Sequence, residues 1–153
     1  MHATKNRVRL VSPAAPDEWA AYHRIRRIVL FENRGRYGVY DSNHPDETKP
    51  GNYPKLLVSD DGYVGVVRID IDEDLAHLRR VAIDEHWRGR GLGRELLALS
   101  ESFARGHGVL RAVSAVAPDA VQFYEKCGYR RVGDDVGASI TMVKDLIRAP
   151  VPR

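Results

Sequence analysis

The most informative stretch of the sequence is Arg88-Gly89-Arg90-Gly91-Leu92-Gly93-Arg94. It lies between a predicted strand at residues 76–83 and a predicted helix at residues 91–105. Its glycines let the backbone approach a ligand closely, and the free N–H groups and dipole at the start of the helix favour an anion there. Its three arginines add forked donors that suit phosphate. The stretch therefore predicts a phosphate-binding turn, with a glycine-rich turn bearing solvated arginines as the alternative.

Two better-known phosphate-binding loops do not fit this stretch. A P-loop ends in Gly-Lys followed by Ser or Thr, whereas Gly93 is followed by Arg94 and Glu95. The dinucleotide-binding fingerprint requires a further glycine at the position of Arg94. The ligand is therefore expected to be neither a P-loop nucleotide nor a dinucleotide of the Rossmann type.

Working outward, hydrophobic periodicity predicts alternating helices and strands on both sides of the glycine loop. The clearest helix is residues 91–105, where Leu92, Leu96, Leu99 and Phe103 form an apolar stripe. Residues 31–54 have no sustained periodicity and are predicted to form a long loop, either functional or a plain surface excursion. The remaining predicted helices are residues 17–30 and 118–127, and the predicted strands are residues 7–11, 55–59, 63–71, 76–83, 109–116, 129–132 and 139–143.

Length and composition favour one ordinary globular domain, residues 1–153. Lysine and arginine total 24 against 21 acidic residues, and the two signs are interspersed, so we expect no nucleic-acid partner and no membrane anchor. The single cysteine excludes an internal disulfide framework and fits a reducing compartment. Residues 1–10 lack the apolar core of a signal peptide, and a cytoplasmic location is therefore expected.

The spacing Arg88-x-x-Gly91-x-Gly93 resembles the acyl-CoA signature of the GNAT superfamily of N-acetyltransferases. The resemblance extends upstream through Leu-Arg-Arg-Val-Ala-Ile-Asp at residues 78–84, and downstream to Ala-Val-Gln-Phe-Tyr-Glu-Lys-Cys-Gly-Tyr at residues 120–129. It implies an α/β fold with a mixed, mostly antiparallel central sheet of six to seven strands. The sheet would be splayed in the middle and flanked by about four helices.

The resemblance also implies a co-substrate, acetyl-CoA, and a reaction. The acetyl group would move to a primary amine, of a small molecule or a peptide, by direct attack in a ternary complex. No metal is implied, a homodimer is compatible with the family, and a non-catalytic acyl-CoA-binding regulatory module remains the alternative. The implied cofactor-binding residues are the strand positions Val81, Ala82 and Ile83 and the loop positions Arg88, Gly89, Arg90, Gly91, Leu92, Gly93 and Arg94.

Two residues are the implied catalytic groups. Tyr124 occupies the position of the family's usual tyrosine acid, which would protonate the leaving thiolate. His77 stands where some members carry a catalytic glutamate, and an imidazole there could accept a proton near neutral pH. The alternatives for the base are water or one of the acidic and basic neighbours Asp70, Asp72, Glu85 and His86. Ala117 departs from the family, which often has a capping asparagine there.

The acceptor site is expected to border the irregular segment. Its candidate contact residues are Arg34, Arg36, Tyr37, Tyr40, Asp41 and His44, and the carboxylates of Asp70 and Asp72 could attract a cationic amine. Cys127 has no histidine near it in sequence and is predicted to be a small packing residue rather than a nucleophile.

Overall fold

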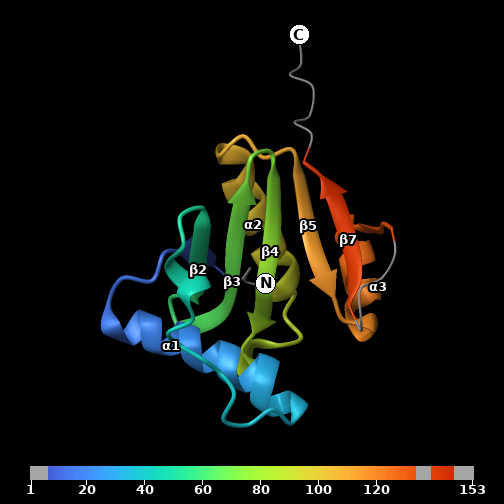
Figure 1. The fold of residues 1–153 in the computed structure, drawn as a ribbon. Helices are drawn as coiled ribbons and strands as arrows, with labels where there is room; N and C mark the ends of the chain where they lie inside the picture. The colour runs from blue at the N-terminus through green and yellow to red at the C-terminus, as the bar shows by residue number, and fades with distance from the viewer. Residues whose placement is uncertain (1–6, 134–138, 147–153) are drawn as a thin grey trace, which may run out of the picture.

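Seven strands form one sheet in the order β1-β2-β3-β4-β5-β7-β6 in the computed structural model, which describes residues 7–133 and 139–146 (Figure 1). The strands are β1 Val8–Val11, β2 Asn52–Ser59, β3 Gly62–Asp72, β4 Leu75–Ile83, β5 Arg111–Val116, β6 Arg130–Arg131 and β7 Ile140–Asp145. The α-helices are α1 Pro16–Arg26, α2 Leu92–Gly106 and α3 Val121–Lys126. The mixed, mostly antiparallel sheet predicted from the sequence is confirmed, with three α-helices in the described residues where about four were expected.

The sheet opens between β4 and β5, which form its one parallel pair among the described strands. Their pairing covers Leu75–His77 against Arg111–Val113 and then ends. The next contact is made by a side chain, because Ser114 Oγ donates to the Leu78 carbonyl at 3.2 Å. The predicted splay in the middle of the sheet is therefore confirmed.

Helices α1 and α2 cover opposite faces of the sheet (Figure 1). The alternation of side chains along a strand sends Leu56 and Val66 to the face covered by α1, and Leu57 and Val67 to the face covered by α2. All four are fully buried, so both faces are sealed by apolar packing. This two-sided core holds the central strands that border the opening.

The segment predicted as a loop contains more structure than its sequence suggests. After α1 the chain continues as a π-helix, Arg27–Phe31, and a 3₁₀ helix, Glu32–Arg34, and a second 3₁₀ helix follows at Pro45–Thr48. Strand β2 begins at Asn52, earlier than predicted, and includes Pro54. Because β1 pairs only with the later part of β2, Pro54 lies at an open edge, where its missing N–H is tolerated.

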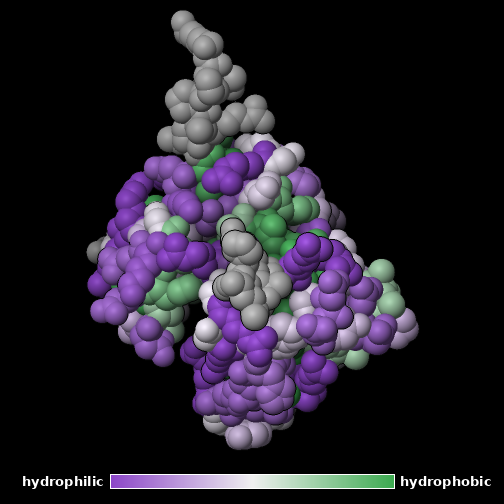
Figure 2. Space-filling view, turned by 180° about the vertical axis from the view of Figure 1, so that it is seen from behind, coloured by the Kyte–Doolittle hydropathy of each residue, from purple (hydrophilic) through white to green (hydrophobic). Residues whose placement is uncertain are grey.

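Nothing in the described ranges 7–133 and 139–146 forms a helix with the length and apolar character needed to cross a bilayer. Seen from behind, the surface is mostly hydrophilic, with apolar residues in small separate areas (Figure 2). Within the same described ranges, no group of three or more His, Cys, Asp or Glu side chains is arranged to hold a metal ion.

Candidate active site

A cleft of about 1010 Å³ lies where β4 and β5 separate. Its lining includes residues 78–81 of β4. It also includes residues 114–116 of β5 and Ala117, which follows that strand. Tyr124 of α3 reaches it from one side, and positions 34 and 36 after the π-helix reach it from another. The interruption of the sheet therefore creates a large concave feature that both predicted catalytic residues border.

A bulge in β4 shapes the wall of the cleft. Val66 pairs with Ala82 and Arg68 pairs with Arg79, so two residues of β4 stand opposite Val67 alone. The extra position is taken up at Arg80, whose φ of 59° lies in the left-handed region that non-glycine residues rarely adopt. Arg80 and its neighbour Val81 both line the cleft.

Tyr124 is held in place by aromatic packing and lines the cleft with little exposure of its side chain, 7%. Its ring meets those of Phe123 and Tyr129 edge to face, with centroids 5.5 and 5.3 Å apart. Burial raises the pKa of Tyr124, and a hydrogen bond with Ser114 offsets part of that rise. The phenol is therefore protonated at neutral pH and can donate a proton or a hydrogen bond.

His77 lies on the other side of the opening, on β4, and also lines the cleft. It pairs across the sheet with Asp70 on β3 and with Val113 on β5. Burial lowers its pKa, the charge of Arg79 lowers it further, and the carboxylates of Asp70 and Asp72 oppose this without cancelling it. The imidazole is therefore neutral at pH 7 and able to accept a proton.

The glycine loop lies beside α2, outside the lining of the cleft. Gly89 and Gly91 have φ of 78° and 74°, and a Cβ added at either would meet nothing within 4 Å. Gly93 differs, because a Cβ there would stand 3.0 Å from Cζ of Phe123, so this glycine permits α3 to pack closely on α2. Two of the three glycines thus leave open backbone, and the third serves packing.

The loop also presents donors. Helix α2 begins at Leu92, so the amides of its first turn have no acceptor within the helix. Arg88, Arg90 and Arg94 are exposed, and Arg90 lies over the ring of Trp87 at 5.0 Å. Of the ten predicted cofactor-binding residues only Val81 lines the cleft, whereas the side chain of Ala82 is buried against the α1 face.

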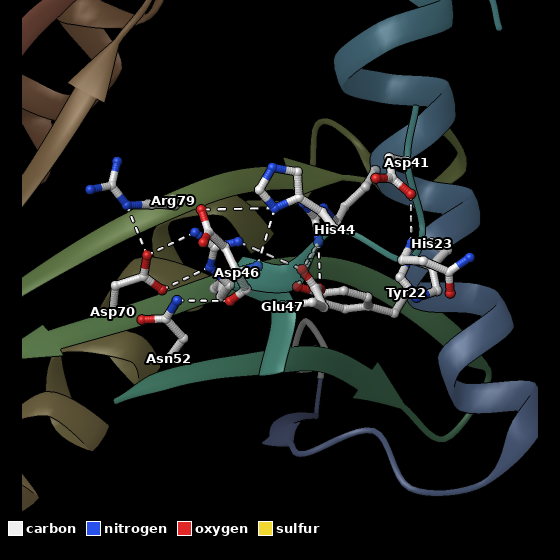
Figure 3. A network of polar contacts seen from close by, with 12 residues as sticks. Tyr22, His23, Asp41, His44, Asp46, Glu47, Asn52, Asp70 and Arg79 are labelled. Atoms are coloured by element: carbon white, nitrogen blue, oxygen red, sulfur yellow. Dashed lines mark hydrogen bonds and ion pairs between the residues drawn. The ribbon is translucent and has the colours of Figure 1, made fainter. Parts of the chain in front are cut away.

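A line of polar side chains joins α1 to the sheet through the 3₁₀ helix Pro45–Thr48 (Figure 3). Arg26 Nη1 donates to both oxygens of Glu47, at 2.5 and 2.6 Å, and to the hydroxyl of Tyr22 at 3.0 Å. Arg68 Nη1 lies 3.7 Å from Glu47 and its other nitrogens donate to both oxygens of Asp70 at 2.8 Å. The irregular segment is therefore fastened to the floor of the cleft by buried charges.

The sequence analysis did not predict this network. Its central pair, Glu47 and Arg26, is buried in the structure. Burial raises the pKa of Glu47, but hydrogen bonds from Tyr22 and Arg26 and the charges of Arg26 and Arg68 outweigh it, and the pKa is lowered. The carboxylate is thus ionised at neutral pH. One usable signal was Arg68 inside the otherwise apolar run at residues 64–69.

The predicted acceptor residues divide into two groups. Arg34 and Arg36 line the cleft, as do Asp70 and Asp72. The others do not: the Tyr40 hydroxyl lies 2.5 Å from His23 Nδ1, Asp41 accepts from the Asn43 amide, His44 accepts from the Asp46 amide, and Tyr37 is 71% exposed.

The remaining residues singled out in the sequence are Glu85, His86, Ala117 and Cys127. Glu85 and His86 form an exposed 3₁₀ turn, Glu85–Trp87, that does not line the cleft, whereas Ala117 does line it. Cys127 is half-buried against the core, and burial raises the pKa of its thiol, which fits a packing role.

Comparison with known proteins assigns this fold to a family. A protein-family model described as the acetyltransferase (GNAT) family matches residues 17–129. Among curated proteins, the chain is 33% identical over 73 residues to the N-alpha-acetyltransferase RimI of Mycobacterium tuberculosis, covering 47% of this chain and 46% of that protein. The matched segments span between 27% and 53% of the length of the curated relatives.

Solved structures extend the likeness to nearly the whole fold. A Lactobacillus plantarum protein provisionally described as an N-acetyltransferase is 28% identical, with a TM-score of 0.76 over 93% of this chain and 100% of that one. An aminoglycoside 6′-N-acetyltransferase complexed with coenzyme A superimposes with a TM-score of 0.79 over 95% of this chain and 99% of that one, at 16% identity. The second likeness concerns the fold alone.

The buried ion pair predicts a specific stability defect. Glu47→Gln leaves the guanidinium of Arg26 buried without its counter-charge, and we expect a loss of about 3–5 kcal/mol in the free energy of unfolding by urea at pH 7. The matched variant Glu32→Gln removes a more exposed pair with Arg27 and is expected to cost less than about 1 kcal/mol.

The same pair sets a pH dependence. Because the folded-state pKa of Glu47 is lowered, its contribution is present above the unfolded value of 4.5 and is lost as the pH falls through the folded value. The stability difference between the parent protein and Glu47→Gln should therefore shrink on acidification below pH 4.5. A difference that stays constant would show that Glu47 does not titrate as described.

Proposed function

The chain belongs to the acetyltransferase (GNAT) family, and from that membership we propose that it transfers an acetyl group from acetyl-CoA to a primary amine in a ternary complex. The observation that carries the proposal is the cleft at the divergence of β4 and β5, with Tyr124 and His77 both on its lining. A site that holds a proton donor and a neutral imidazole around one open space suits the two proton movements of amide formation.

The residues of the glycine loop fit a diphosphate. The Cβ positions of Gly89 and Gly91 face open space, and the first-turn amides of α2 carry the partial positive charge of the helix terminus. Arg88 and Arg94 add exposed guanidinium groups beside these amides. We therefore propose that the loop binds the diphosphate of the co-substrate, and that the β4 backbone at Val81 lies along its acyl-bearing arm.

The chain's own residues would handle the protons. Acetyl-CoA supplies a thioester whose carbonyl carbon is attacked by the amine nitrogen and whose sulfur leaves. His77, directly or through water, would accept the proton that the ammonium form of the acceptor must lose, since such an amine has an ordinary pKa near 10.4. The Tyr124 hydroxyl would donate to the departing sulfur, and positioning of the two reactants would supply most of the rate.

Co-substrate binding is the first test. Isothermal titration of the full chain with acetyl-CoA should show one saturable site, and a mixture with a panel of primary amines should release free thiol and form amide. Saturable binding without transfer to any amine would favour the non-catalytic acyl-CoA-binding module. Absence of binding at millimolar acetyl-CoA would overturn both.

Tyr124→Phe tests the proton donor. Because the ring and its packing remain, we expect acetyl-CoA affinity to be unchanged while kcat falls on the order of 10- to 100-fold, the lower range for loss of a general acid. Tyr53→Phe is the control, because Tyr53 packs on Phe103 and His107 away from the cleft. If kcat of Tyr124→Phe equals that of the control, Tyr124 takes no part in the chemistry.

His77→Gln tests the proton acceptor through the pH profile. The pKa of His77 is lowered below 6.5, so kcat/KM of the parent protein should fall only when the pH drops below that value. The variant should be slower at pH 8 and should lack this acid-side decline, whereas His107→Gln, at the end of α2, should keep the parent profile. An unchanged profile in His77→Gln would assign the proton to water.

A further inference from the structure

The charged side chains that line the cleft are mostly positive. Six of its lining side chains are lysines or arginines, and only three are carboxylates. His77 adds no positive charge at neutral pH, because burial and Arg79 lower its pKa. The cations that line the cleft are Arg34, Arg36, Lys49, Arg68, Arg79 and Arg80.

Three carboxylates cannot balance six cations, and one of the three is already shared between two arginines. Asp70 accepts from Arg68 Nε and Nη2 and from Arg79 Nε, all at 2.8 Å. Asp46 lies 3.8 Å from the ring of His44. Asp70 therefore serves to pair two arginines of the sheet, and it offers no free charge to an acceptor ammonium group.

Arg80 is a solvent-exposed cation of this cleft. It forms no hydrogen bond or ion pair with any residue in the described ranges, 7–133 and 139–146, although it lines the cleft. Burial lowers its pKa, and the like charges of Arg26, Arg68, Arg79 and Arg36 lower it further. The bulge holds its backbone in the left-handed region. A bound anion would offset the repulsion that the guanidinium feels from the neighbouring arginines.

Arg36 is a second cation that suits such a site. It lines the same cleft, and its guanidinium stacks over the ring of Phe31 at 4.8 Å, which fixes its position without neutralising its charge. Its charge is felt at Arg80, which places the two groups in one electrostatic cluster. Two forked donors from different segments suit a carboxylate or a phosphate.

We propose that Arg80 and Arg36 bind an anionic group of the acceptor, so that the acceptor is a molecule carrying a carboxylate or phosphate in addition to its amine. This inference rests on the proposed function, since it names the substrate class of that site. The phosphates of the co-substrate offer the same chemistry, but the loop proposed to bind them lies outside the lining of the cleft. The two sources are therefore separable by experiment.

The first experiment compares acceptors in matched pairs. L-amino acids are tested against their amides, and amino-sugar phosphates against the unphosphorylated amino sugars, with acetyl-CoA and the full chain. We expect kcat/KM to be at least tenfold higher for the anionic member of each pair that is acetylated. Equal or faster acetylation of the neutral members would overturn the inference while leaving the proposed function intact.

Variants then assign the preference to its residue. Arg80→Gln should raise KM for the anionic acceptor on the order of 10- to 100-fold, as expected for loss of charged hydrogen bonds, and should leave acetyl-CoA affinity unchanged. Arg36→Gln provides a second variant with an unstrained backbone, and Arg24→Gln, on the exposed face of α1, is the matched control. Weaker acetyl-CoA binding with an unchanged acceptor KM would assign the arginines to the co-substrate and overturn the inference.

A measurement without turnover separates the two proposals. Thermal unfolding is compared in sodium phosphate and in sodium chloride of equal ionic strength, for the parent protein, Arg80→Gln and Arg24→Gln. The phosphate-dependent rise in Tm should be smaller for Arg80→Gln than for the other two proteins. Equal rises would overturn the anion site, whether or not acetyl transfer is observed.

Discussion

The cleft depends on one constraint, which is that β4 and β5 stop pairing after His77. Beyond that point β4 needs other partners, and they are supplied by β3 on one side and by the Ser114 hydroxyl on the other. The bulge opposite Val67 lies on the same stretch of β4, and residues 77–81 all line the opening. If β4 and β5 paired along their whole length, no cleft would open between them. The early end of their pairing therefore exposes the lining residues to a ligand.

Keeping the strands apart requires rigid packing on both faces. Helix α2 packs apolar side chains against one face of β3 and β4, and α1 seals the other with Tyr22 and Ile25. The close fit of Gly93 against Phe123 ties the start of α2 to α3, and thereby ties the glycine loop to the helix that carries Tyr124. The position of the tyrosine relative to the loop is therefore set by packing rather than by either segment alone.

The regular elements could be predicted from sequence because their signals are local. The stripe from Leu92 to Phe103 and the alternation along β3 require no knowledge of distant contacts. The 3₁₀ helix at Pro45–Thr48 could not be predicted, because it is held by Glu47 against Arg26 and Arg68, residues 21 positions away in each direction along the chain. The bulge at Arg80 was equally hidden, since its register depends on how β3 pairs with β4. For the same reason the sequence indicated Tyr124 and His77 but not the arginine cluster on the same cleft.

Asp70 affects the charges of the cleft in two ways, through its arginine partners and through His77. Its charge is shared between Arg68 and Arg79, which removes both from competition for a ligand, whereas Arg80 pairs with no carboxylate in the described part of the chain. The same carboxylate, directly across the sheet from His77, opposes the lowering of the imidazole pKa by burial and Arg79. Loss of this charge would therefore free two guanidinium groups and lower the pKa of His77 further. Asp70 therefore links the electrostatics of His77 to those of Arg68 and Arg79 on the same sheet.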